Sequence, residues 1–122
     1  MDEYVAEELE SAKRALSDAR KLRAVGGTDE AIVNRLYYSC FHAAQSVLYS
    51  RGEEPTSHGG VLVLFGQVIV SEGDATRDDG RFLNEMQSHR LTADYEHGTV
   101  TADVDELFAR TETFVEDMET LL

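Results

Sequence analysis

Residues 29–51, DEAIVNRLYYSCFHAAQSVLYSR, decide the fold that we expect for this chain. Drawn as a helix with 3.6 residues per turn, this stretch is apolar on nearly every side. Its apolar residues are Ile32, Val33, Leu36, Tyr37, Tyr38, Cys40, Phe41, Ala43, Ala44, Val47 and Leu48. A helix without a wide polar face has to be covered on most sides. Residues 29–51 are therefore predicted to form the central helix of a bundle and to pack in part against another subunit.

The segment before the central helix is predicted to be a helix as well. Residues 2–25 carry an apolar stripe whose members are alternately four and three positions apart, and Gly26-Gly27 ends the pattern. Thr28 is the expected N-cap of the central helix, because its hydroxyl can accept a hydrogen bond from a free backbone N–H in the first turn.

Three more helices are expected after the central one. Ser57 is predicted to cap a short helix that ends near residue 72; strand propensity is high at 61–65, but no second strand is available to pair with it. Residues 73–80 are predicted to be a mobile turn and residues 81–94 a fourth helix. Thr101 is expected to cap a last helix. The prediction is one all-α domain, residues 1–122, built as an up-and-down antiparallel bundle of four to five helices.

The charge of the chain is strongly acidic. Its 122 residues include 24 Asp and Glu against 11 Lys and Arg, which gives a net charge of −13. The carboxylates are scattered along the sequence rather than gathered in a block, which favours adaptation to a salt-rich, halophile-like cytoplasm over a single acidic face that mimics nucleic acid. The acidity argues against a broad nucleic-acid-coating surface but leaves room for a local RNA-cleaving site.

Several functional classes are disfavoured. Cys40 is the only cysteine, so no internal disulfide and no thiol-rich metal site is expected. No two histidines have metal-ligand spacing on one helix, and no glycine-rich phosphate loop occurs, so no metal, no cofactor and no NTPase activity is predicted. The N-terminus lacks signal-peptide features and the longest apolar stretch, 61–70, is too short to cross a bilayer. We expect a soluble, cytoplasmic protein without membrane contact.

Three motifs occur in a fairly specific combination. They are NRLYYSCFHAA at 34–44, PTSHGGV at 55–61 followed by LFG at 64–66, and RLTADY at 90–95. Together they resemble the small stand-alone archaeal and bacterial branch of the HEPN superfamily (higher eukaryotes and prokaryotes nucleotide-binding). The resemblance extends over about residues 1–122 and implies the helical bundle already expected.

The resemblance also implies an activity and partners. Members of this branch dimerise and are often encoded beside a minimal nucleotidyltransferase as a toxin–antitoxin pair. Active members are metal-independent endoribonucleases with an arginine, four to six residues, and then a histidine, which Arg90 and His97 match at the long end. Tyr95 occupies the position of the histidine in the commonest spacing. It is a candidate catalytic residue and, by the same resemblance, a candidate site of adenylylation by the partner.

The chemistry of Arg90 and His97 fits metal-free RNA cleavage. The ribose 2′-hydroxyl attacks its own phosphate, so a proton must be removed and negative charge must be stabilised. A guanidinium binds two phosphate oxygens, and an imidazole exchanges protons near neutral pH. Along an unbroken helix the two residues would lie about 10 Å apart, so the helix has to end near Asp94. The alternatives are an Arg90–Asp94 ion pair, an exposed His97, and a Tyr95 that anchors the turn.

Asn34, Arg35 and Tyr38 on the central helix, with Asp94, are candidate substrate-binding residues. The competing interpretation is a structural polar network, because a buried arginine needs a polar partner. For His42 and His58 we expect a satisfied core histidine and a helix-entry residue. Three functions stay open: a homodimeric endoribonuclease controlled by a nucleotidyltransferase, a non-catalytic module that binds nucleotide, RNA or that partner, and a structural dimer whose site has lost its activity.

Overall fold

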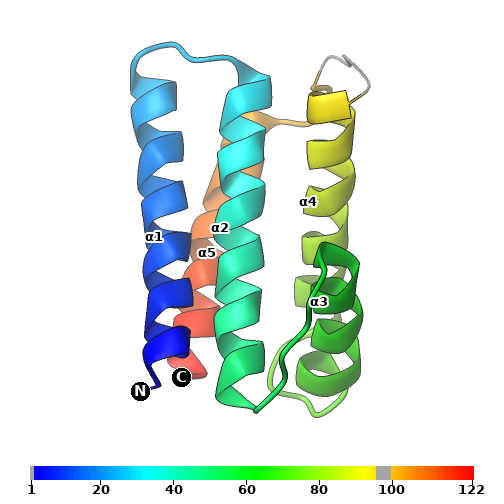
Figure 1. Cartoon of the computed structure of the whole chain (residues 1–122). Helices are drawn as coiled ribbons and strands as arrows, with labels where there is room; N and C mark the ends of the chain where they lie inside the picture. Colours follow the sequence, from blue (N-terminus) through cyan, green and yellow to red (C-terminus); the bar gives the residue numbers. More distant parts are fainter. Residues whose placement is uncertain (1, 96–99) are drawn as a thin grey trace.

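The computed structural model describes residues 2–95 and 100–122. Its elements are α1 (Glu3–Ala24), α2 (Asp29–Ser50), α3 (His58–Leu64), the π-helix η1 (Phe65–Val70), α4 (Arg77–Tyr95) and α5 (Val104–Thr120). The described residues contain helices and no strand, so the predicted all-α bundle is confirmed. Figure 1 shows α1 and α2 side by side, α5 behind them, α4 beyond α2, and α3 beside the first half of α4.

α2 is the central helix, as predicted. It contacts each of the other elements, and twelve of its residues are buried. Among the largest fully buried side chains of the protein, α2 supplies Tyr37, Leu36, Leu48, Val33 and Val47. Burial of one such side chain stabilises the fold by roughly 1.5–3 kcal/mol. The expected packing of α2 on a second subunit remains a prediction.

α1 lies close to α2 because small residues meet along their contact. Ala12 and Ala19 of α1 are fully buried, and the hydroxyl of Ser39 donates a hydrogen bond of 2.8 Å to the carbonyl oxygen of Ala12. α1 also contacts α5, to which three exposed ion pairs join it. They are Lys13–Glu119, Arg20–Glu112 and Arg23–Asp105.

Of the four helix starts predicted after the first helix, two are correct. Thr28 and Ser57 accept hydrogen bonds from the backbone N–H groups three residues later, at 3.2 and 3.0 Å. The expected cap at Thr101 is wrong, because α5 begins after Asp103, whose carboxylate accepts from the N–H of Glu106 at 3.2 Å. A carboxylate at this position also favours the positive end of the helix.

The predicted start of α4 at residue 81 is also wrong. Thr76 and Asp79 cap the helix reciprocally: the Asp79 N–H donates to the Thr76 hydroxyl at 3.1 Å, and the Thr76 N–H to the Asp79 carboxylate at 2.9 Å. This arrangement is a capping box. α4 therefore starts at Arg77, and the last four residues of the expected turn are helical.

η1 was not predicted. The Ser71 N–H donates to the carbonyl of Gly66, five residues earlier, at 3.1 Å, which is the hydrogen bond of a π-helix. Phe65 and Ile69 of η1 are fully buried. Gly73, with φ +85°, ends the segment in a conformation that glycine adopts readily.

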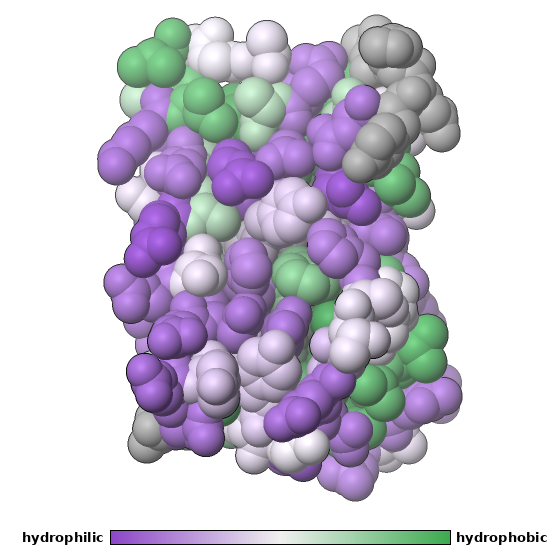
Figure 2. Space-filling model, viewed as in Figure 1, coloured by the Kyte–Doolittle hydropathy of each residue, from purple (hydrophilic) through white to green (hydrophobic). Residues whose placement is uncertain are grey.

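Most of the surface in Figure 2 is hydrophilic, and apolar side chains gather at its lower right, around α3. Val63 of α3 is 56% exposed, and Leu62, Leu64 and Val68 are partly buried against the core. In the described parts of the chain, no helix combines the length and the apolar character that a bilayer crossing requires.

Candidate functional site

Arg90 lies in the second half of α4, against the aromatic face of α2. Its guanidinium carbon is 4.8 Å from the centre of the Tyr37 ring and 5.9 Å from that of Tyr38, and the residue is 8% exposed. Nη2 donates to the Oε1 atom of Gln87 at 3.4 Å. A cation over an aromatic ring is stabilised by about 0.5–2 kcal/mol, more where water is excluded. The Tyr37 ring therefore holds the positive charge at the contact between α2 and α4.

A chain of polar contacts connects Arg90 with the first turns of α2. Asp94 Oδ2 lies 3.8 Å from Arg90 Nη1 and accepts a hydrogen bond of 3.0 Å from Asn34 Nδ2. Asn34 Oδ1 in turn accepts from Arg35 Nε and Nη2 at 3.0 and 2.7 Å. The Arg35 guanidinium carbon lies 5.1 Å from the centre of the Tyr38 ring. The structure thus brings all four candidate substrate-binding residues together beside Arg90.

The alternative interpretation of Arg90, an ion pair with Asp94, is also present. At 3.8 Å it is about 1 Å longer than a charge-assisted hydrogen bond. Asp94 is held instead by Asn34, whose hydrogen bond is 3.0 Å long. The Arg90–Asp94 contact is therefore loose, and the carboxylate is positioned mainly by α2.

His97, the predicted proton-transfer residue, lies outside the described residues, and so does the side chain of Tyr95. The described part of α4 extends to Tyr95, one residue beyond the Asp94 at which the helix was expected to end. The convergence of His97 with Arg90, and the catalytic and modification roles of Tyr95, remain predictions.

His58, which the sequence indicated only as a helix-entry residue or an anion contact, is a neighbour of this site. Its Nδ1 lies 3.0 Å from the Tyr37 hydroxyl, and its ring stacks on Phe41 with centroids 4.4 Å apart. Desolvation raises the pKa of Tyr37 to about 12, against the lowering effect of Arg90. Desolvation, followed by Arg90 and His42, lowers the pKa of His58. At neutral pH the phenol is therefore protonated and His58 is neutral, so that the phenol donates to Nδ1.

A second imidazole, that of His42 on α2, contacts α1. Its Nδ1 lies 2.6 Å from Oε2 of Glu8 on α1. This contact with Glu8 satisfies the imidazole, as expected. The side chain is 28% exposed, so His42 lies at the edge of the core. The ring contacts both Tyr38 and Phe41.

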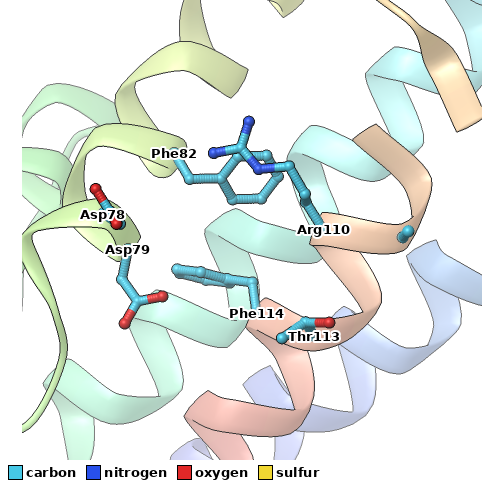
Figure 3. A pocket seen from close by; sticks show the side chains of 7 residues that line it. Asp78, Asp79, Phe82, Arg110, Thr113 and Phe114 are labelled. Carbon is cyan, nitrogen blue, oxygen red and sulfur yellow. The ribbon is translucent and has the colours of Figure 1, made fainter. Parts of the chain in front are cut away.

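Figure 3 shows a hollow of about 280 Å³ between α4 and α5, which is separate from the candidate site around Arg90. The rings of Phe82 and Phe114 line it, and the Arg110 guanidinium carbon lies 4.3 Å from the centre of the Phe82 ring. Arg110 also pairs with Glu85 at 3.3 Å. These contacts join α4 to α5, and none of the candidate site residues lines this hollow.

Over residues 2–95 and 100–122, no cluster of three or more His, Cys, Asp and Glu residues is arranged to hold a metal ion. The side chains around Arg90 are guanidinium, amide, phenol and carboxylate groups from α2 and α4. What this arrangement offers a ligand is a fixed positive charge beside hydrogen-bonding groups, which suits an anion such as a phosphate.

Comparisons with known proteins identify the family of the chain. A family model described as "HEPN domain" matches residues 5–121. A protein of Methanocaldococcus jannaschii, whose name describes it as a candidate toxin, is 29% identical over 119 residues, which cover 97% of this chain and 84% of that protein.

Two further relatives bear the name UPF0332 protein. One, from Thermotoga maritima, is 36% identical over 69% of this chain. The other, from Pyrococcus horikoshii, is 35% identical over 74% of this chain. The chain spans 63% of the length of each of these two proteins.

Proposed function

The chain belongs to the HEPN domain family, and we propose that it is the metal-independent endoribonuclease subunit of a toxin–antitoxin pair whose other member is a minimal nucleotidyltransferase. The observation that carries the proposal is the placement of Arg90. A nearly buried guanidinium lies on the ring of Tyr37, close to the C-terminal end of α4 and seven residues before His97. The similarity to a protein named as a candidate toxin supports the same role.

In the proposed reaction Arg90 binds two oxygens of the scissile phosphate. The ribose 2′-oxygen forms a bond to phosphorus, the bond from phosphorus to the 5′-oxygen breaks, and the products are a 2′,3′-cyclic phosphate and a 5′-hydroxyl. His97 takes the 2′-hydroxyl proton, and a water molecule gives a proton to the leaving 5′-oxygen. The guanidinium stabilises the extra negative charge of the phosphorane, which is the largest contribution in reactions of this kind.

The loose Arg90–Asp94 contact is compatible with this role. A phosphate can replace a carboxylate 3.8 Å away at lower cost than one in a bidentate pair. Asp94 keeps its hydrogen bond with Asn34 when this happens. Asn34, Arg35 and Tyr38 then form the α2 side of the substrate site.

Dimerisation is part of the proposal. A two-fold axis would place two copies of the Arg90 site near each other. The apolar patch around α3, with Val63 56% exposed, is the surface that we expect to be covered by the second copy. Val63→Asp is expected to give a monomer in light scattering, with unchanged helicity.

The test is cleavage of single-stranded RNA by the purified protein in the presence of EDTA. Arg90→Gln is expected to lower the rate at least about 100-fold, because one charge-stabilising donor is worth that much. His97→Gln should have a comparable effect. Arg110→Gln is the matched control, since Arg110 also lies over a ring, that of Phe82, and also pairs with a carboxylate. Full activity in both site variants would refute the nuclease role.

One observation favours the second candidate, a binding module without catalysis. Tyr95 occupies the position of the histidine in the commonest motif spacing. In that case RNA or nucleotide binds with a dependence on Arg90, but no cyclic phosphate forms at any protein concentration. Adenylylation by the partner is tested separately: Tyr95→Phe should abolish the gain of one adenylyl group in intact mass, with the fold unchanged.

A further inference from the structure

A second cavity lies between α1, α2 and the segment that leads into α3. Its volume is about 280 Å³. Glu8, Phe41, His42 and His58 are among the residues that line it. Two of the four histidines of the chain thus contribute to one cavity, although neither belongs to the Arg90–His97 motif.

We propose that this cavity is a nucleobase subsite, in which the base of a nucleotide next to the scissile phosphate is bound between the imidazoles of His42 and His58. The inference rests on the proposed function in one respect, because it takes single-stranded RNA as the ligand.

The hydrogen bonds of the two imidazoles assign their free nitrogen atoms. His42 Nδ1 lies 2.6 Å from a carboxylate oxygen of Glu8, so Nδ1 carries a proton and is bound to Glu8, which leaves Nε2 for a ligand. His58 Nδ1 accepts from the protonated Tyr37 hydroxyl at 3.0 Å, so its Nε2 carries the proton and is a donor. The cavity therefore offers the Nε2 atoms of two imidazoles, and that of His58 is a donor. Every nucleobase exposes a donor and an acceptor on its Watson–Crick edge, which single-stranded RNA leaves free for a protein.

The walls and the volume of the cavity also suit a base. The rings of Phe41 and His58 are stacked, with centroids 4.4 Å apart and planes inclined by 27°. Unpaired RNA bases are typically bound against Phe, Tyr, Trp and His side chains. A volume of about 280 Å³ is at the lower end of ligand pockets, which measure about 300–1,000 Å³. It suits one planar heterocycle better than a folded oligonucleotide.

Tyr37 connects this cavity with the proposed phosphate site. The Arg90 guanidinium carbon lies 4.8 Å from the centre of its ring, and its hydroxyl group binds His58. Arg90 is also close enough to His58 to contribute to the lowering of its pKa. The proposed phosphate site and the base subsite thus share one neighbour, the buried Tyr37 side chain.

The test is histidine ring NMR on the full chain during titration with AMP, GMP, CMP and UMP, and with ribose 5-phosphate as the ligand that lacks a base. At least one nucleotide is expected to shift the ring signals of both His42 and His58, and ribose 5-phosphate is expected to leave them unchanged. His42→Phe, which keeps the ring shape and removes both nitrogens, should weaken nucleotide binding at least tenfold. His89→Gln on α4 is the control and should bind as the wild type does.

The other outcomes overturn the inference. If ribose 5-phosphate shifts the same signals as the nucleotides do, the site binds anions only. If no nucleotide shifts His42 and His58, or if His42→Phe binds normally while its thermal unfolding is unchanged, there is no base subsite. Binding and cleavage fail separately: a protein that binds nucleotides here but never cleaves RNA keeps the subsite and loses the nuclease role. If the protein cleaves RNA and His42→Phe changes neither the rate nor the base preference, the nuclease role stands and the base subsite is refuted.

Discussion

Asn34 and Asp94 are sixty residues apart in the sequence, and a 3.0 Å hydrogen bond from Asn34 Nδ2 to Asp94 Oδ2 joins α2 to the end of α4. The same amide accepts two hydrogen bonds from Arg35 through Oδ1. Both contacts together fix the orientation of the amide, since the reversed amide would direct its NH₂ group at a guanidinium. Asn34 thus links the positive charge of Arg35 with the carboxylate beside Arg90.

Replacement of this amide should loosen the end of α4. Asn34→Ala removes the hydrogen bond to Asp94 and is expected to lower the free energy of unfolding by about 1 kcal/mol. Asn34→Asp should cost more, because it places a second carboxylate next to Asp94. Urea unfolding measures both effects. Asn84→Ala is the control, as the Asn84 side chain bonds only the Gly80 carbonyl within α4, at 2.9 Å; an equal loss in that variant would contradict the role given to Asn34.

Tyr37 should ionise later than an exposed tyrosine during an alkaline titration. Its pKa is raised to about 12, whereas in the unfolded chain it ionises near pH 10. The folded state keeps the proton that the unfolded state releases, so stability decreases as the pH rises from about 10 to 12. Tyrosinate absorbance followed in the wild type and in Tyr37→Phe measures the shift. A wild-type titration curve without this late component would refute it.

Stability should also decrease on the acid side because of His58. Its pKa is lowered in the folded protein, first by desolvation and then by Arg90 and His42. The unfolded chain therefore binds the proton more tightly, and stability is lost as the pH falls through the unfolded value of about 6.5. Thermal unfolding at pH 7.5 and pH 5.5 should show a smaller difference for His58→Asn than for the wild type. Equal differences would mean that His58 does not contribute.

Cys40 should be unreactive in the folded protein. Its side chain is fully buried, its sulfur lies 3.6 Å from the Thr111 hydroxyl, and burial raises the pKa of the thiol to about 12. Because the thiolate is the reactive form, the native protein should release almost no chromophore from a disulfide reagent such as DTNB. One equivalent should appear in 6 M guanidinium chloride. Rapid reaction of the native chain would show that the core opens around Cys40.

Salt should stabilise this protein. With 24 carboxylates and 11 basic residues, repulsion acts across the whole surface, and it is screened within roughly 3 Å at 1 M salt. The three exposed α1–α5 ion pairs weaken as well, but such pairs contribute at most about 1 kcal/mol each. We expect the melting temperature to rise by about 5 °C or more between 0.1 and 2 M KCl, which is roughly 1 kcal/mol of stability.

The exposed carboxylate of Glu7 provides the matching variant for the salt experiment. Glu7→Lys makes the net charge less negative by two. This variant should reach a given melting temperature at a lower KCl concentration than the wild type does. A melting temperature that falls in KCl would contradict the expected salt adaptation of the surface.

The central helix was predictable because its apolar residues surround the helix axis. This pattern can be recognised within one segment, without knowledge of the neighbouring elements. The start of α4 was not predictable, since Gly80 was taken as a break. Inside the helix this glycine lies against η1, where an added Cβ would be 3.4 Å from a Val70 methyl, so tertiary packing overrides its low helix propensity. The Tyr37–His58 contact was missed for a similar reason: it joins residues 21 positions apart, and no periodic pattern within one helix reports it.

The π-helix has a consequence for the length of the chain at this point. The core residues Val61, Phe65 and Ile69 are spaced by four, and in an α-helix each step of four advances about 40° beyond a full turn. The wider turn of η1 reverses that drift, so Ile69 returns to the face of Val61. An ordinary α-helix of the same length would carry Ile69 about 80° away from Val61 and out of the interior, whereas deletion of one residue from η1 would leave it within about 20° of Val61. The wide turn of η1 therefore accommodates one residue more than an ordinary helix would, and this part of the protein should tolerate the loss of that residue.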